Sequence, residues 1–187
     1  MAPLLIILAA VTLLPLIWAL AGYNRFVRLR QHIRESWSDI DLELKRRYEL
    51  IPNLVETVKG YATHEREVLQ RVVELRDRAL HSTGSASQQA VDESALQIGM
   101  KQLFAVVESY PELRADANFL ALQQELANTE DRIAAARRFF NANVRELNQL
   151  CEMFPTNMLA SMFGFERTSF FELENDAERV VPRVELS

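Results

Sequence analysis

Carboxylates and three histidines are the residues of this 187-residue chain that could hold a metal ion. Helical bundles that bind two metal ions through carboxylates repeat Glu-x-x-His on two helices, because residues three apart share a helix face. None of His32, His64 and His81 has a glutamate three residues before it. The acidic residues are then a solvated face with ion pairs such as Glu43 with Arg47, four residues apart. We expect no metal ion and no cofactor, and a metal-binding helical enzyme stays only as a residual alternative.

Other reactive groups are equally isolated. Cys151, the single cysteine, falls in phase with an apolar helical stripe, so we expect a core thiol rather than a nucleophile. His64 and Glu65 stand at a predicted helix start, where a polar cluster at a helix end is a simpler interpretation than an acid–base pair. The sequence has no glycine-rich phosphate loop and no serine in a nucleophile elbow. We therefore expect a protein that is not an enzyme and has no catalytic residues.

The block LIPNLVETVKGY, residues 50–61, carries more pattern than a helix requires. Asn53, Lys59 and Gly60 form the candidate partner surface within it. The alternative, which we favour, is that Pro52, Asn53 and Gly60 define a helix reversal, because proline and glycine punctuate backbone geometry.

Four arginines follow the apolar N-terminus and are candidate contacts for lipid headgroups: Arg25, Arg28, Arg30 and Arg34. A basic cluster beside a membrane attracts anionic lipids. The alternative is that these arginines only fix the membrane topology. We favour this alternative, because Glu35, Asp39 and Asp41 soon reverse the charge.

Residues 1–22 are the predicted transmembrane anchor. Positions 2–22 carry no charged residue, and as a helix they would rise about 32 Å, enough to cross the hydrocarbon core. The alternative is a cleaved signal peptide, since Ala19-Leu20-Ala21 resembles a cleavage site. We favour the anchor, because the apolar run is long and no lysine or arginine precedes it. Arginines after the span predict a single-pass membrane protein with its soluble part on the cytoplasmic side; the alternative is the opposite side of the membrane.

The remaining chain predicts an all-α fold: an N-terminal transmembrane helix followed by an elongated antiparallel four-helix bundle over residues 23–165. An apolar stripe runs from Trp37 to Ala79 across Pro52. We expect the chain to reverse between Leu50 and His64, with a kink at Pro52 as the alternative.

Later boundaries have clearer signals. HSTGSAS, residues 81–87, predicts a loop, and a helix is expected over about 88–109. A long helix with a heptad-like seam should begin after the N-cap residue Asp116 and stop at Pro155. The apolar piece 156–165 either caps the bundle, which we favour, or enters the membrane interface. Residues 166–187 are expected to be an extended or disordered acidic tail.

Several blocks of this sequence resemble the LemA family of bacterial membrane-anchored helical proteins. They are YNRFVRLR (23–30), WSDIDLELKRRYELIPNLVETVKGYATHE (37–65), YPELRADANFLALQQELANTEDRIAAARRFFN (110–141), FPTNMLASMFGF (154–165) and FFE (170–172). The resemblance implies one transmembrane segment, a helical bundle and no shared enzymatic activity. It also implies that the predicted span lies in the bacterial inner (cell) membrane, with the bundle in the cytoplasm or, as the alternative, on the periplasmic side. It also implies relatives that build magnetic organelles and others that lie beside membrane proteases or envelope proteins.

These observations favour a non-enzymatic scaffold or adaptor that recruits proteins to the membrane or assembles with itself as a homo-oligomer. The alternative is a regulator of an adjacent membrane enzyme such as a protease, which the resemblance alone suggests. The net charge of −5 argues against a nucleic-acid partner, because phosphate binding requires a basic face.

Overall fold

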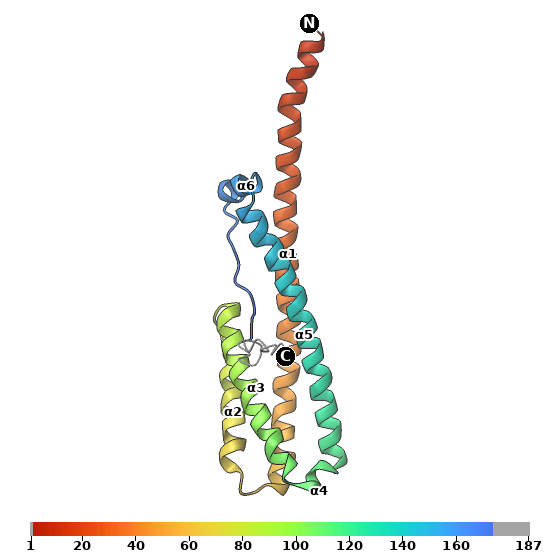
Figure 1. Ribbon diagram of the computed structural model, residues 1–187, viewed down its shortest axis with the longest axis vertical. Coiled ribbons are helices and arrows are strands. Elements are labelled where there is room, and N and C mark those ends of the chain that lie inside the picture. The colour runs from red at the N-terminus through yellow and green to blue at the C-terminus, as the bar shows by residue number, and fades with distance from the viewer. Residues whose placement is uncertain (1, 174–187) are drawn as a thin grey trace, which may run out of the picture. The chain divides into compact units, whose positions relative to one another are not determined.

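The computed structural model describes residues 2–173, and over these residues it is all-helical, with no strand (Figure 1). The helices are α1 (Ala2–Tyr61), α2 (Arg66–Leu80), α3 (Ala86–Glu108), α4 (Pro111–Arg114), α5 (Ala117–Glu152) and α6 (Thr156–Phe163). The all-α class is confirmed. Most of the predicted acidic tail, residues 174–187, lies outside the described residues.

The N-terminal part of α1 is apolar and exposed. Among the described residues, α1 is the one helix that is long and apolar enough to cross a membrane. Its first third exposes a series of large apolar side chains: Leu4, Ile7, Val11, Leu13, Leu14, Leu16, Ile17 and Leu20. A surface of this kind is rare in water, so this segment is a candidate membrane span.

Proline at position 52 does not end α1. Proline has no N–H, so the carbonyl of Tyr48, four residues earlier, loses its helical hydrogen bond. Arg76 of α2 replaces the missing donor, because its Nε donates to the Tyr48 carbonyl oxygen at 3.1 Å. A proline is therefore accommodated inside the helix by a side chain from the neighbouring helix.

The chain reverses ten residues after Pro52, at residues 62–65 between α1 and α2. The expectation of a reversal in this region is confirmed. The interpretation of Pro52 and Asn53 as the reversal itself is wrong, because both lie inside α1. Gly60 lies in the last turn of α1, directly before the reversal.

The chain forms two compact units, Met1–Asp39 with Ala136–Phe170, and Ile40–Ala135 with Phe171–Ser187. In the second unit, α2 and α3 lie beside the C-terminal part of α1 and the N-terminal part of α5 in an antiparallel arrangement (Figure 1). Gly99 allows α2 and α3 to approach closely, since a Cβ atom there would lie 2.7 Å from Leu75 Cδ1. The core of this unit includes the buried residues Ile51, Leu54, Val58, Leu69, Val72, Leu96, Leu103 and Phe119.

The first unit packs the N-terminal part of α1 against the C-terminal part of α5 and against α6. Phe26 stacks on Phe165 with ring centroids 4.6 Å apart, and Trp37 lies 5.4 Å from Phe140. Leu29, Leu147, Leu150, Leu159 and Ala160 complete this core. Segment 156–165 therefore supplies core side chains on one of its faces.

The N-terminus of α5 agrees with its sequence signal. Asp116 Oδ1 accepts a hydrogen bond from the Phe119 N–H at 2.9 Å, which confirms Asp116 as the N-cap. This bond, together with one from the Tyr61 hydroxyl, lowers the pKa of Asp116. The helix ends at Glu152, three residues before Pro155.

The pairing of Pro52 with Arg76 gives a double-mutant prediction. We expect Arg76→Met to lower the free energy of unfolding by about 1–3 kcal/mol, because the buried Tyr48 carbonyl loses its donor. In a Pro52→Ala background the same change should cost under about 1 kcal/mol, since an alanine at this position supplies a backbone N–H that restores the helical bond. The measurement is chemical denaturation of the full chain in detergent, followed by circular dichroism.

Arg71→Met is the matched control, because Arg71 is an exposed arginine of α2 that pairs with Glu74 on the surface. Arg71→Met should change the free energy of unfolding by no more than about 0.5 kcal/mol. An equal loss from Arg76→Met in both backgrounds would show that Arg76 does not compensate for the proline.

Candidate functional site

The most unusual side chain of the second unit is Arg47 of α1, which is only 1% exposed. Its Nη2 forms an ion pair with Glu93 Oε2 of α3, which is also buried. Its Nη1 donates to Glu130 Oε1 of α5 at 2.8 Å. The predicted surface pair of Glu43 with Arg47 is wrong, because Glu43 pairs with Arg46 instead, at 2.9 Å.

The Glu93 carboxylate receives further donors. Its Oε1 accepts from the Tyr48 hydroxyl and from Gln89 Nε2, the latter at 3.0 Å. Gln89 Nε2 also lies 3.1 Å from the Ala79 carbonyl oxygen at the end of α2. Burial raises the pKa of Tyr48 to about 12, so its phenol keeps the proton that it donates.

The network thus joins α1, α2, α3 and α5. Arg47 balances the charge of Glu93, and its second donor reaches Glu130 at the partly exposed edge. Because Glu93 is nearly inaccessible and accepts three donors, it has no free position for a substrate or an ion. This cluster is built to position helices, since its polar atoms find partners in only one register.

The sequence did carry a signal for this network. Leu44, Arg47, Ile51, Leu54 and Val58 are spaced by three and four residues, so Arg47 interrupts an otherwise apolar stripe. In α3 the same spacing places Gln89 and Glu93 in line with Leu96, Met100 and Leu103. Our sequence reasoning missed all three polar residues because it treated charged side chains as members of the solvated face.

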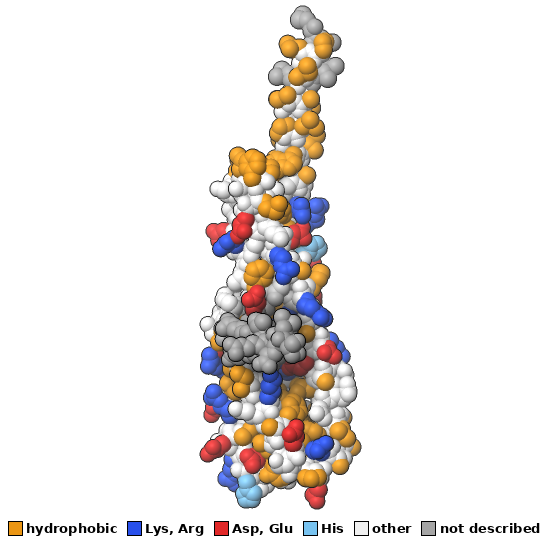
Figure 2. Space-filling view, viewed as in Figure 1, with side chains coloured by type: hydrophobic (Ala, Val, Ile, Leu, Met, Phe, Trp, Pro, Cys, Tyr) orange, Lys and Arg blue, Asp and Glu red, His pale blue; other side chains and the backbone are white. Residues whose placement is uncertain are grey.

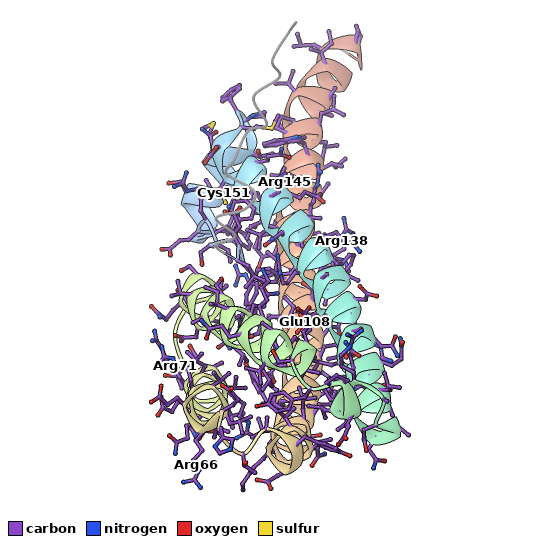
Figure 3. The ribbon with its side chains drawn as sticks, turned by 60° about the horizontal axis from the view of Figure 1, so that its bottom comes forward. Arg66, Arg71, Glu108, Arg138, Arg145 and Cys151 are labelled. Atoms are coloured by element: carbon purple, nitrogen blue, oxygen red, sulfur yellow. The ribbon has the colours of Figure 1, made fainter. Side chains whose placement is uncertain are left out.

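A groove with a volume near 660 Å³ lies between the C-terminal part of α1 and α2. Val55 and Leu69 are its buried apolar residues, and Val73 is partly exposed on it. Charged side chains also line it: Glu56, Lys59, Arg66 and Glu74. An apolar interior with a few charged groups is typical of a recognition site. Figure 3 shows Arg66 and Arg71 projecting outward from α2.

The candidate partner residues Asn53, Lys59 and Gly60 are all exposed. Lys59 lines the groove and lies 3.1 Å from Glu56 Oε1. The backbone carbonyl oxygen of Asn53 accepts a hydrogen bond from the Thr57 hydroxyl at 2.8 Å. A Cβ atom added at Gly60 would meet open space. These three residues can be reached from outside, and their role in binding stays a prediction.

The four candidate headgroup arginines, Arg25, Arg28, Arg30 and Arg34, are exposed on α1. Arg25 Nη2 pairs with Glu146 Oε1 of α5 at 2.9 Å. The Arg30 guanidinium lies 4.4 Å from the Phe165 ring centroid, in a cation–π contact. Two of the four therefore also hold α1 to the elements packed on it, and their contact with lipid stays a prediction.

The side chains considered as candidate reactive groups lie in different parts of the chain. Cys151 is partly buried near α6, with Sγ 3.7 Å from the Phe165 carbonyl oxygen, and burial raises its thiol pKa (Figure 3). A raised pKa leaves less thiolate at neutral pH, which disfavours nucleophilic chemistry. His64 and Glu65 lie in the α1–α2 reversal. Within residues 2–173, no group of three or more histidine, cysteine or acidic residues is arranged to hold a metal ion.

Comparison with known proteins gives consistent matches. The model of a family described as the LemA family matches residues 36–186. The magnetosome protein MamQ of Magnetospirillum gryphiswaldense is 24% identical, over 88% of this chain and 71% of that protein. MamQ 2 of Paramagnetospirillum magneticum is 26% identical, over 82% of this chain and 65% of that protein. Protein LemA of Metamycoplasma hominis is 24% identical, over 84% of this chain and 71% of that protein. The chain thus spans about two thirds of the length of these relatives.

The buried ion pair predicts an asymmetric mutational response. Arg47→Met should lower the free energy of unfolding by about 3–5 kcal/mol, because Glu93 remains buried without its cation. Adding Glu93→Met should recover part of that loss, because no unpaired charge remains, while the Tyr48 hydroxyl loses its acceptor. Denaturant unfolding of the full chain in detergent measures both.

Arg46→Met is the control, because Arg46 adjoins Arg47 but is itself exposed, and its partner Glu43 also pairs with Arg132. It should cost at most about 1 kcal/mol. Equal losses from Arg46→Met and Arg47→Met would contradict the role assigned to the buried pair.

Proposed function

This chain belongs to the LemA family, and we propose that it is a non-enzymatic scaffold of the bacterial envelope. In this proposal the N-terminal part of α1 anchors the chain in the inner membrane. The helical bundle binds protein partners or further copies of the chain. Two of the relatives are named for magnetosomes, and none of the relatives' names above states a reaction.

The observation that carries the proposal is the exposed apolar surface of α1. Leu4 is 72% exposed and Leu14 is 66% exposed, and Ile7, Val11 and Leu13 are similarly uncovered. Burying such residues in lipid is favourable by about 25 cal/mol for each Å² removed from water. A bilayer would cover this whole surface and keep the rest of the chain beside the membrane.

The second support is the chemistry of the bundle. Its buried polar groups Arg47, Tyr48 and Glu93 already bind one another. An accessible hollow is instead the groove that Val55, Lys59 and Val73 line. Such a surface suits recognition of a protein segment, with apolar contact in the groove and charge at its edge.

Arginine distribution supports a cytoplasmic bundle. Arg25, Arg28, Arg30 and Arg34 follow the candidate span directly. Positively charged residues flanking a span stay on the cytoplasmic side. The N-terminus would then lie outside the inner membrane.

Cysteine labelling tests this topology. With Cys151→Ser as background, Asn53→Cys should react with a membrane-impermeant maleimide only after spheroplasts are permeabilised. Asp131→Cys, at a second exposed position, should behave in the same way. Labelling of both positions in intact spheroplasts would place the bundle on the periplasmic side.

Site-specific photo-crosslinking tests the scaffold function. A benzoylphenylalanine at Lys59 should give adducts of discrete mass in cells, identified by mass spectrometry. The same probe at Asp131, which is exposed on α5 away from the groove residues, is the matched control. Val73→Arg should abolish the Lys59 adducts, because the larger charged side chain fills the groove.

Probes at Asn53 and Gly60 extend the map, since both are exposed but do not line the groove. Identical adducts at Lys59 and Asp131, or Lys59 adducts that persist in Val73→Arg, would reject the groove as the partner site. An absence of adducts at every position in cells at native expression would reject the scaffold.

A further inference from the structure

Within the first unit, α6 and the turn before it carry an exposed apolar surface. We call Met153, Phe154, Met158, Met162 and Phe163 the apolar tip. Phe154 is 78% exposed and Met162 is 75% exposed, and the other three are also uncovered. In Figure 2 apolar side chains cover α6 beside the apolar part of α1. The tip is thus continuous with the surface that the proposed function assigns to lipid.

The opposite face of α6 is fixed to α1. Leu159 and Ala160 are buried, and Leu159 packs so closely on Gly22 that a Cβ atom there would lie 2.6 Å from Leu159 Cδ1. Tyr23 contacts the Phe163 ring edge-on, with centroids 4.8 Å apart. These contacts place α6 beside residues 22–23 of α1.

Residues 22–23 are where the character of α1 changes. Every residue from position 2 to Gly22 is uncharged, and Arg25 is the first charged residue after it. Along a helix the distance from Gly22 to Arg25 is only about 4.5 Å. Trp18 and Tyr23 flank this boundary, and such aromatic residues are enriched at membrane interfaces. The tip therefore lies at the depth where α1 would leave the hydrocarbon core.

We propose that the apolar tip inserts into the headgroup–acyl boundary of the same bilayer that α1 spans, as a second membrane contact. The inference rests on the membrane anchor of the proposed function. Lipid is the occupant that fits, because the tip adjoins the exposed apolar face of α1 and Arg25, Arg28 and Arg30 follow it directly. The insertion would fix the rotation of α1 about its axis, which a single span alone leaves free.

Depth measurement by electron paramagnetic resonance tests the insertion. The full chain with Cys151→Ser carries a nitroxide at Met162→Cys and is reconstituted in vesicles of phosphatidylethanolamine and phosphatidylglycerol. Oxygen, which concentrates in lipid, and a water-soluble nickel chelate compete to relax the label. We expect a label about 5–10 Å below the phosphates, the depth typical of interfacial helices.

Two further labels distinguish a failure of the tip insertion from a failure of the membrane anchor. Val11→Cys reports on the span itself, and Ser38→Cys lies about 24 Å beyond Gly22 along α1 and should be in water. If the labels at Val11 and Met162 are both found in lipid, the inference is supported. If the Val11 label is in lipid but the Met162 label is accessible to the nickel chelate, the insertion is overturned and the anchor is left intact. Both labels in water overturns the anchor and the insertion together.

A second copy of the chain could instead cover the tip, and the same sample reveals it. Dipolar coupling between Met162 labels, or protection from both oxygen and nickel, would overturn the inference. As a matched pair, Met158→Glu should raise the nickel accessibility of the Met162 label to the value at Ser38. Met158→Leu should leave it unchanged, because it keeps the apolar contact with lipid. Unchanged accessibility in Met158→Glu would count against insertion.

Discussion

A guanidinium group leaves water at a tolerable cost only where its charge is paired, and the two Nη atoms of Arg47 meet carboxylates on two other helices. Glu93 of α3 and Glu130 of α5 both bind it, and Gln89 extends the contacts to the end of α2. The apolar side chains of this unit could pack in several registers, because hydrophobic contact is not directional. The Arg47 network can form in only one of them, since each polar atom left unpaired would carry a desolvation cost.

Tyr48 links this network to the second constraint on α1. Its hydroxyl donates to Glu93, while its carbonyl, which Pro52 deprives of a helical donor, accepts from Arg76. Tyr48 thus takes part both in the network that fixes the register of the helices and in the hydrogen bond that makes a proline tolerable inside α1. Because α1 continues through Pro52, a single unbroken helix carries both the candidate membrane span and a quarter of the bundle.

The two units of this chain have different surfaces. The first unit presents apolar surfaces that water does not favour, on α1 and on α6. The other unit keeps its charged network inside and offers a groove between α1 and α2. The proposed anchored recognition module accounts for both features, and the buried charged groups Arg47 and Glu93 pair with one another. The family relationship agrees with this division without supplying a reaction.

The sequence alone determined the helical class, the apolar N-terminal segment, the loop after α2 and the Asp116 cap, because these depend on local periodicity and on neighbouring residues. It did not determine that Pro52 stays inside α1, since the compensating donor, Arg76, comes from the next helix. It also did not reveal that Arg47 is buried, because the two carboxylates that make burial tolerable lie 46 and 83 positions away in the chain. Only the tertiary structure brings such partners together. It likewise decided that one face of α6 packs on α1 while the other remains uncovered, because periodicity marks apolar residues without saying what they meet.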